Sequence, residues 1–286
     1  AVKLDPADVL PEAVDNTTAS DAGVEKLVSD IEAEIVAEAR HCVGLGANIL
    51  HLHARDEDGA PTWRKEVYAR IIGGIRDHCP QVVICVSLSG RDFGEYDQRA
   101  DPLLLDGDLR PDMASLTLSS LNFARSASVN SPEMIQRLAA RMLEIGVKPE
   151  LEVFDAGMVN YARYLADKGL LEPPFYFNIL LGNVASAQAT PAALGHLISE
   201  LPAGSLWTGG GIGACQLAMN TMGLMFGNGL RVGLEDYLWM DPERLEIASN
   251  SAMVQRAVDL GQEIPHFVAD LLDEHPEDLF RARLRA

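Results

Sequence analysis

Two histidines stand at the end of a short apolar run in the sequence Asn48-Ile49-Leu50-His51-Leu52-His53-Ala54-Arg55-Asp56. The composition of residues 49–53 favours a strand, and in a strand residues i and i+2 project from the same face. His51 and His53 can therefore converge on one metal ion. Neutral imidazole is the commonest protein ligand for zinc, and a catalytic zinc site adds a third protein ligand and keeps one position open.

The His-x-His pattern is not specific to metal sites, because it also occurs as two polar residues on the wet face of an edge strand or as a buried hydrogen-bonded pair. The residues after the apolar run favour a ligand site. A charged turn over residues 55–59 ends the strand, so both histidines lie at its carboxyl end. Parallel α/β folds build their ligand sites at that end, and the third ligand is expected at the end of another strand.

The composition indicates a folded, acidic protein. Of its 286 residues 48% are hydrophobic, which excludes a disordered chain, and the formal net charge is -19. This acidity argues against a nucleic-acid partner, since phosphate binding draws on clustered Lys and Arg. No apolar run reaches the roughly 18 to 20 residues that cross a bilayer. The four cysteines show no CxxC or disulfide spacing, which fits a soluble, cytoplasmic protein.

Strand-like and helix-like segments alternate along the chain. The expected strands are 2–4, 49–53, 82–87, 113–118, 151–154, 175–181, 205–208 and 230–234. The expected helices are one from Ser20 or Asp21 to about Gly44, then 64–78, 131–145, one after Gly157, 191–201, 213–226 and 242–261. Eight strands in units of roughly 25 to 40 residues predict an α/β fold of the (β/α)8 TIM barrel type.

The domain prediction depends on this alternation, because no linker or shift in composition divides the chain. We predict a single barrel catalytic domain over residues 1–263 and a C-terminal extension over 264–286. A doubly wound sheet is the alternative. The absence of a GxGxxG motif after an early strand argues against it.

In a barrel the carboxyl ends of the strands meet at one mouth. Polar side chains expected there are Ser87, Ser89, Ser115, Thr117, Glu150, Glu152, Asp155, Arg231, Glu235 and Asp236. Glu235 is the best source of the third metal ligand, because strand eight lies near strand two in a closed barrel. Asp236 then remains as a base that can pair with Arg231. Alternatively, Glu-Asp after a strand simply caps the next helix.

A glycine run opens the expected helix at 213–226. It reads Trp207-Thr208-Gly209-Gly210-Gly211-Ile212-Gly213. Glycines let backbone N–H groups approach an anion, and barrels often bind phosphate after strand seven. Glycine-rich βα loops also serve as tight turns, so an anion site and a turn both fit the run.

Taken together, five motifs resemble the beta-keto acid cleavage enzyme family. They are His51-Leu52-His53-Ala54-Arg55-Asp56 with Gly59, Ser119-Ser120-Leu121-Asn122-Phe123, Pro149-Glu150-Leu151-Glu152-Val153-Phe154-Asp155-Ala156-Gly157-Met158, Gly211-Ile212-Gly213 and Arg231-Val232-Gly233-Leu234-Glu235-Asp236. The resemblance runs from about Gly44 to Val258. It implies a zinc-dependent (β/α)8 barrel, usually a homotetramer, that converts a 3-keto acid and acetyl-CoA to acetoacetate and a new acyl-CoA.

The resemblance also implies roles for individual residues. The implied zinc ligands are His51, His53 and Glu235. The implied catalytic residues are Asp236 as the base and Arg231, which works with it through a water. The implied substrate-binding residues are Ser87 and Ser115 on the carboxylate side of the keto acid, with Glu152 as an acidic pocket residue. Ser115 stands where the type enzyme has Thr.

Three segments depart from the family pattern. Residues 1–20 lack the usual Thr-Gly-Ala type segment, Ala214 replaces the basic residue usual after Gly-Ile-Gly, and the tail over 264–286 differs from the family's usual ending. The first two departures leave the identity of the keto acid open, and the third bears on the subunit contacts.

Three other functions fit parts of the pattern. A metal-dependent lyase of the hydroxymethylglutaryl-CoA lyase type also uses a strand-borne His-x-His pair but needs no second acyl-CoA. An amidohydrolase needs further histidines on later strands, and the remaining histidines fall in expected helical or tail segments. A non-enzymatic barrel with a structural metal is opposed by the open ligand position, because structural zinc is normally four-coordinate by protein.

Overall fold

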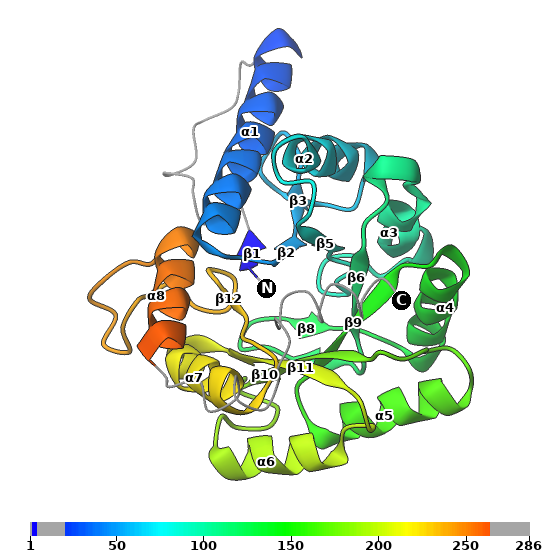
Figure 1. The fold of residues 1–286 in the computed structure, drawn as a ribbon. Helices are drawn as coiled ribbons and strands as arrows, with labels where there is room; N and C mark the ends of the chain where they lie inside the picture. The colour runs from blue at the N-terminus through cyan, green and yellow to red at the C-terminus, as the bar shows by residue number, and fades with distance from the viewer. Residues whose placement is uncertain (1, 5–20, 264–286) are drawn as a thin grey trace.

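The computed structural model describes residues 2–4 and 21–263, and side chains over 32–263 (Figure 1). The N-terminal segment 5–20 and the predicted C-terminal extension over 264–286 lie outside the described residues. In the part of the chain that is described, no helix is both long and apolar enough to cross a membrane.

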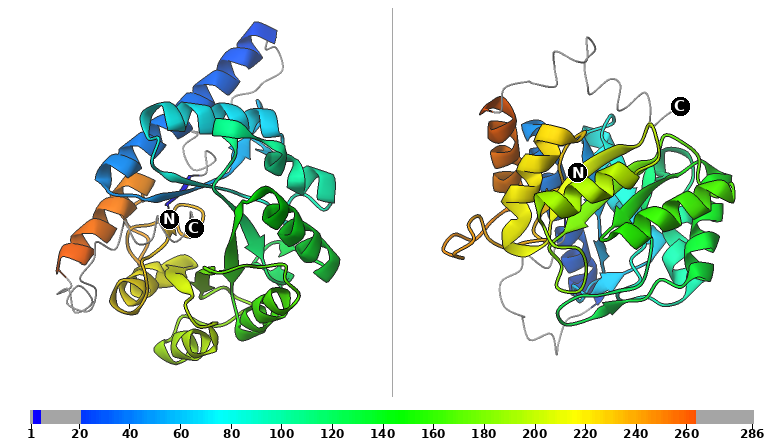
Figure 2. Two further views of the ribbon diagram at one scale, coloured as in Figure 1. Left: turned by 45° about the vertical axis from the view of Figure 1, so that its right-hand side comes forward. Right: turned by 90° about the horizontal axis from the view of Figure 1, so that it is seen from below.

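Eight parallel strands form one curled sheet with helices around its outside (Figures 1 and 2). The strands are β1 (Val2–Leu4), β2 (Ile49–Leu52), β5 (Val83–Val86), β6 (Met113–Thr117), β9 (Lys148–Val153), β10 (Tyr176–Leu181), β11 (Leu206–Gly211) and β12 (Val232–Gly233). Their order is β11-β10-β9-β6-β5-β2-β1-β12, which follows the chain except that β12 lies beside β1. The doubly wound alternative is therefore wrong, because such a sheet reverses its strand order at a switch point.

The helices alternate with the strands much as the sequence predicted. They are α1 (Asp21–Leu45), α2 (Lys65–His78), α3 (Tyr96–Ala100), α4 (Pro132–Ile145), α5 (Ala156–Asp167), α6 (Pro191–Glu200), α7 (Gln216–Phe226) and α8 (Asn250–Glu263). Local signals set the ends of α4: the Ser131 hydroxyl accepts a hydrogen bond from Met134 N, and Gly146 adopts a left-handed φ of 70°.

The predicted start of the last helix at residue 242 is wrong, because α8 begins at Asn250. The Asp241 carboxylate accepts hydrogen bonds from the backbone N–H groups of Leu245 and Glu246, and Arg244 adopts a positive φ of 62°. Side-chain to backbone hydrogen bonds of this kind hold a turn in place of a helix.

Smaller elements that the sequence did not predict lie between the strands. The short antiparallel pairs are β3 (Ala54–Arg55) with β4 (Pro61–Thr62), and β7 (Leu121–Asn122) with β8 (Ala127–Ser128). Within residues 21–263 there are three 3-10 helices, at Asp101–Leu104, Gly107–Leu109 and Gly213–Cys215. The long segment between β5 and β6 is thus partly helical, through α3 and the first two of these.

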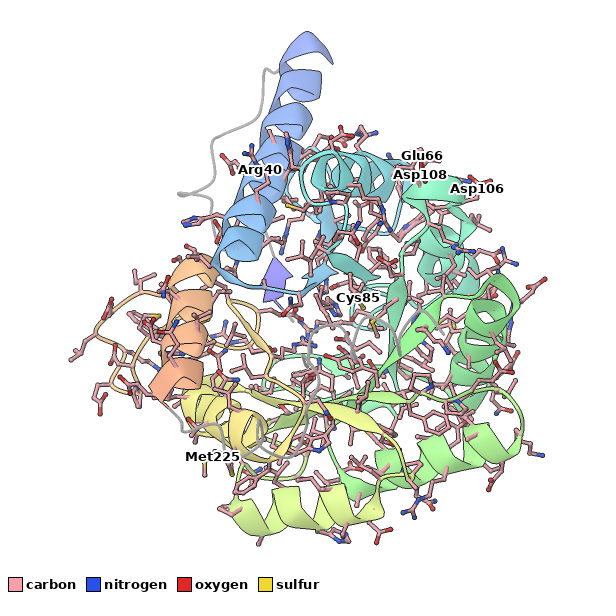
Figure 3. All side chains as sticks on the ribbon, in the orientation of Figure 1. Arg40, Glu66, Cys85, Asp106, Asp108 and Met225 are labelled. Atoms are coloured by element: carbon pink, nitrogen blue, oxygen red, sulfur yellow. The ribbon has the colours of Figure 1, made fainter. Side chains whose placement is uncertain are left out.

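The two faces of the sheet differ in chemistry. In β2, Leu50 and Leu52 belong to the large core cluster that the helices share, whereas Ile49 belongs to a smaller cluster that also contains Cys85. His51 therefore projects to the same side as Ile49, because side chains alternate along a strand. Figure 3 places Cys85 on the inner side of the curled sheet, so the concave side of the sheet carries the polar residues of the strand ends.

Gly209, Gly210 and Gly211 of the run over residues 207–213 lie in β11, and Gly209 and Gly211 let α7 pack closely on the sheet. A Cβ at Gly209 would lie 2.7 Å from the Met219 carbonyl oxygen and 3.1 Å from Gly223 Cα. A Cβ at Gly211 would lie 2.6 Å from Gln216 Cα. Close helix packing accounts for these two glycines without an anion.

We expect Gly209→Ala to lower the free energy of unfolding by about 1 to 3 kcal/mol, because the added methyl overpacks a backbone contact. Gly195→Ala in α6 is the matched control, since a Cβ there would meet nothing within 4 Å. Replacing a helical glycine in open space should instead stabilise by about 0.5 to 1 kcal/mol. Urea unfolding of the three proteins compares them, and equal midpoints for the two variants would contradict the packing role.

Candidate metal centre and active site

His51 and His53 come together at the carboxyl end of β2. The sequence predicted a strand over residues 49–53, but β2 ends at Leu52. His53 therefore lies just beyond the strand. The two imidazole rings nevertheless stack, with centroids 5.3 Å apart and an interplanar angle of 27°. The His51 side chain is fully buried and the His53 side chain is 19% exposed. The His51 ring therefore lies deeper in the protein than the His53 ring, which reaches solvent.

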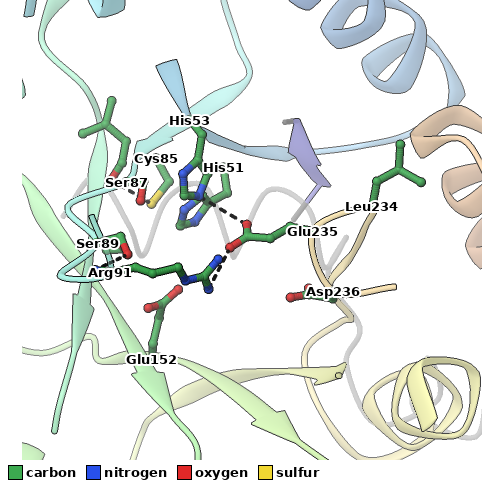
Figure 4. Close-up of polar contacts among 12 residues, drawn as sticks. His51, His53, Cys85, Ser87, Ser89, Arg91, Glu152, Leu234, Glu235 and Asp236 are labelled. Carbon is green, nitrogen blue, oxygen red and sulfur yellow. Dashed lines mark hydrogen bonds and ion pairs between the residues drawn. The ribbon is translucent and has the colours of Figure 1, made fainter. Parts of the chain in front are cut away.

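Glu235 joins the two histidines from a distant part of the chain (Figure 4). It follows β12, and β12 lies beside β1, which pairs with β2. The Glu235 Oε2 atom is 3.2 Å from His53 Nε2, and the side chain is 9% exposed. Two imidazoles and one carboxylate are a donor set that divalent zinc accepts, so the residues at this position fit a metal ion.

A second donor cluster shares His51 and lies deeper. The potential ligand atoms of His51, Cys85 and Glu150 are all within 4.8 Å of one another, and the three residues are buried. The thiol is a poor ligand as it stands, because metals bind thiolate. Burial, followed by the negative charges of Glu150 and Glu152, raises the pKa of Cys85 well above 9.0.

Arg231 lies at the centre of a group of carboxylates. Its Nε atom is 3.1 Å from Asp236 Oδ2, and its Nη1 atom is 3.3 Å from Glu152 Oε1 and 4.0 Å from Glu150 Oε2. The side chain is 1% exposed. Burial by itself would lower the pKa of Arg231, but the charges of Asp236, Glu150 and Glu152 outweigh it and raise the pKa above its ordinary value.

A pocket opens beside these residues. It is lined by Ser87, Ser89, Arg91, Thr117, Leu121, Phe123, Ser128, Glu152, Phe154, Leu180, Ile212, Arg231, Glu235 and Asp236. Ser115 is not among the lining residues, and its hydroxyl accepts a hydrogen bond from Leu88 N at 3.0 Å. Thr117, two residues along the same strand, lines the pocket and donates to Glu152 Oε2 at 2.6 Å.

Arg91 and Phe123 are pocket residues that the sequence did not single out as site residues. The Arg91 guanidinium carbon lies 4.5 Å from the centre of the Phe123 ring, and Arg91 Nη2 is 3.5 Å from Glu235 Oε1. The loop of Arg91 is anchored by Arg99, whose Nε atom donates to the Leu88 carbonyl at 2.8 Å. Burial lowers the pKa of Arg99 to about 10, so the anchor stays charged at neutral pH.

Asp155 is the strand-end acid that takes a structural role. Its carboxylate accepts a hydrogen bond from Met158 N at 3.2 Å and caps the start of α5. Among the histidines outside the site, His41, His78 and His196 lie in α1, α2 and α6, as the sequence predicted. His266 and His275 lie outside the described residues. The amidohydrolase alternative thus gains no ligand from the described part of the chain.

Comparison with solved structures shows the fold. ObcA, in its ternary complex with a C4-CoA adduct and oxalate, superposes with a TM-score of 0.70 at 20% sequence identity. The match covers 85% of this chain and 66% of the ObcA chain. Type I 3-dehydroquinate dehydratase from Clostridium difficile matches with a TM-score of 0.50 at 10% identity, over 82% of this chain and 89% of that one.

Comparison of sequences identifies the family. The model of the beta-keto acid cleavage enzyme family matches residues 31–273. The 3-keto-5-aminohexanoate cleavage enzyme of Fusobacterium nucleatum subsp. nucleatum is 37% identical over 238 residues, which are 82% of this chain and 85% of that protein. The 3-oxoadipate:acetyl-CoA acetyltransferase of Cupriavidus necator is 33% identical over 240 residues, 83% of this chain and 82% of that protein. Because the family model and both relatives span most of the sequence, the chain belongs to the beta-keto acid cleavage enzyme family.

Proposed function

We propose that the protein is an acyltransferase that converts a 3-keto acid and acetyl-CoA to acetoacetate and an acyl-CoA. The observation that carries this proposal is the position of Glu235, which lies 3.2 Å from His53 Nε2 and also lines the pocket that contains the Arg231–Asp236 pair. The names of the relatives, which include an acetyl-CoA acetyltransferase, support the same reaction class. Neither of the two relatives is named a lyase, so the hydroxymethylglutaryl-CoA lyase alternative is not favoured.

In this proposal His51, His53 and Glu235 hold a zinc ion. The chemistry supplied by bound zinc is Lewis-acid polarisation of a carbonyl oxygen. Ser87, which lines the pocket, donates a hydrogen bond to the substrate carboxylate. Ser115 assists Ser87. The Ser115 hydroxyl oxygen accepts the hydrogen bond from Leu88 N, so the hydroxyl hydrogen is still available to donate toward the carboxylate side of the substrate. Glu152 forms the acidic wall of the pocket.

Asp236 acts as the general base. It removes a proton from C2, the carbon between the keto and carboxylate groups, and Arg231 fixes the position of its carboxylate. The C2 carbanion attacks the acetyl thioester, a carbon–carbon bond forms, and CoA leaves as a thiolate. The thiolate adds to the original keto carbon C3, and the C2–C3 bond breaks. C2 then recovers the proton, so the products are acetoacetate and the new acyl-CoA.

We also propose that the curled sheet closes into a (β/α)8 barrel, with residues 1–263 as the catalytic domain. Gly209 N in β11 donates to the Gly229 carbonyl at 3.2 Å, and Arg231 N donates to the Gly209 carbonyl at 3.0 Å. These bonds join β11 to the segment that leads into β12, and support closure. The homotetramer and the cytoplasmic location remain predictions from the sequence.

The reaction is tested by measuring acetoacetate and acyl-CoA with zinc-loaded protein, acetyl-CoA and cationic, neutral and anionic 3-keto acids. We expect turnover that requires acetyl-CoA, is lost with a chelator and returns with zinc. His51→Ala should bind no zinc and give no product. His41→Ala in α1 is the matched control, because His41 is exposed and outside the site.

Two outcomes would contradict the proposal. Cleavage that proceeds without acetyl-CoA would assign the protein to the lyase class. One zinc ion bound per chain with no turnover of any 3-keto acid would favour the non-enzymatic alternative.

A further inference from the structure

We infer that Glu150 positions His51, by accepting the hydrogen on Nδ1 so that Nε2 is presented to the metal centre. Glu150 Oε2 lies 2.6 Å from His51 Nδ1, and both side chains are fully buried. The inference rests on the proposed metal centre of His51, His53 and Glu235, and assigns Glu150 a role beside it that is neither ligand nor base.

The contact is not one between neighbouring strands. His51 lies on β2 and Glu150 on β9, and β5 and β6 separate these strands in the sheet. The Glu150 side chain therefore reaches His51 across the concave side, past Cys85 on β5, whose sulfur lies 3.5 Å from the same carboxylate oxygen. Sheet pairing alone does not bring the two side chains together, so the hydrogen bond is a specific feature of the interior.

The other carboxylate oxygen of Glu150, Oε1, accepts a hydrogen bond from β10. Asn178 Nδ2 donates to Glu150 Oε1 at 3.1 Å, and the Thr208 hydroxyl lies 3.4 Å from Asn178 Oδ1. The Tyr176 hydroxyl lies 3.0 Å from that of Thr208. This buried chain of hydrogen bonds across β9, β10 and β11 fixes the orientation of the carboxylate that meets His51.

The charge of the carboxylate decides what the contact does. An ionised carboxylate only accepts hydrogen bonds, so the imidazole nitrogen facing it carries the hydrogen and the other nitrogen keeps its lone pair. Arg231 Nη1, 4.0 Å from Glu150 Oε2, supplies a compensating positive charge. A carboxylate behind a metal-binding histidine fixes the ring orientation and raises the basicity of the ligand nitrogen.

The deeper cluster of His51, Cys85 and Glu150 leads to the opposite expectation. A metal held there would take His51 Nδ1, because Nδ1 is the nitrogen that faces Glu150 Oε2, 2.6 Å away, where the hydrogen bond now lies. The two centres thus use different nitrogens of the same imidazole. The position of one hydrogen on His51 distinguishes Glu150 as a positioning residue from Glu150 as a ligand.

The first measurement needs no substitution in the chain. Nitrogen-15 NMR of histidine side chains in the metal-free protein should show His51 as the Nδ1–H tautomer, and in the zinc-loaded protein Nε2 should be the bound nitrogen. Zinc bound through Nδ1 would overturn the inference. The His51 signal is assigned by its absence from His51→Ala.

The second measurement is zinc affinity by competition with a chromophoric chelator. Glu150→Gln should weaken zinc binding about 10- to 100-fold, the usual effect of removing such a partner. Asp155→Asn is the control, because it also changes a carboxylate to an amide, but Asp155 caps α5 through Met158 N outside the metal centre, so zinc affinity should stay unchanged. Thermal unfolding of the metal-free variants confirms that each is folded.

The outcomes separate this inference from the proposed function. Unchanged zinc affinity in Glu150→Gln would overturn the positioning role while leaving the metal centre intact. If the single variants Cys85→Ala and Glu150→Gln both failed to bind zinc, the ion would lie in the deeper cluster and Glu150 would be a ligand. Unchanged zinc binding in His53→Ala and Glu235→Gln would overturn the proposed metal centre itself.

Discussion

Arg231→Met is expected to lower the free energy of unfolding of the metal-free protein by about 3 to 5 kcal/mol. Arg231 is the buried cation among Asp236, Glu152 and Glu150, at 3.1, 3.3 and 4.0 Å. Methionine fills much of the same space but removes the charge, so the carboxylates stay buried without compensation. That loss is a large fraction of the roughly 5 to 15 kcal/mol that stabilises a typical domain.

Urea unfolding at neutral pH measures this effect, with Arg163→Met as the matched control. Arg163 Nη1 pairs with Glu200 Oε2 at 2.9 Å, but the side chains are 39% and 42% exposed. An exposed pair contributes about 0 to 1 kcal/mol, so the control should unfold close to the parent. Equal losses in the two variants would contradict a special role for the buried arginine.

Much of the fold could be predicted from local signals. The α4 helix ends at the predicted residue and begins one residue after the predicted start, because Ser131, Pro132 and Gly146 each act within one turn of a helix end. The start of α8 could not be predicted in this way. The Asp241 carboxylate accepts hydrogen bonds from the N–H groups of Leu245 and Glu246, which in a helix from residue 242 would donate to the backbone carbonyls of residues 241 and 242. Helical periodicity does not reveal that competition.

The candidate site was predictable where it depends on strand ends. His51, His53 and Glu235 meet because carboxyl ends of parallel strands share one edge of the sheet, and β12 lies beside β1. The sequence shows which side chains of a strand share one face, but not how far along the strand the pocket lies. It therefore could not place Ser115 under Leu88 and Thr117 at the pocket, although both residues project from the same face of β6.

The unpredicted part of the site depends on tertiary contacts. Arg91 lies in a loop without periodicity, and it reaches the pocket because Arg99 binds the Leu88 carbonyl and Phe123 packs under the Arg91 guanidinium. Those contacts join β5, α3 and the segment after β7. No residue spacing in the sequence indicates these contacts, so the position of Arg91 at the pocket could not be predicted from the sequence.

Asp236→Asn is expected to lower kcat about 10²- to 10⁴-fold, the usual contribution of a positioned general base. Asparagine has nearly the same shape and can still accept a hydrogen bond from Arg231 Nε, but its amide cannot take a proton from C2. Zinc content should stay at the parental value, and KM should change much less than kcat. Loss of zinc in this variant would instead point to a ligand or folding role.

Proton transfer can be measured apart from acyl transfer. In D2O without acetyl-CoA, the parent should accelerate exchange of the C2 hydrogens of the 3-keto acid above the background rate, and Asp236→Asn should not. Asp155→Asn is the matched control, because Asp155 caps α5 and asparagine caps a helix equally well. If Asp236→Asn accelerated exchange as the parent does with zinc bound, another group would be the base. Full exchange combined with slow turnover would place Asp236 in a later step, because the carbanion would then form without it.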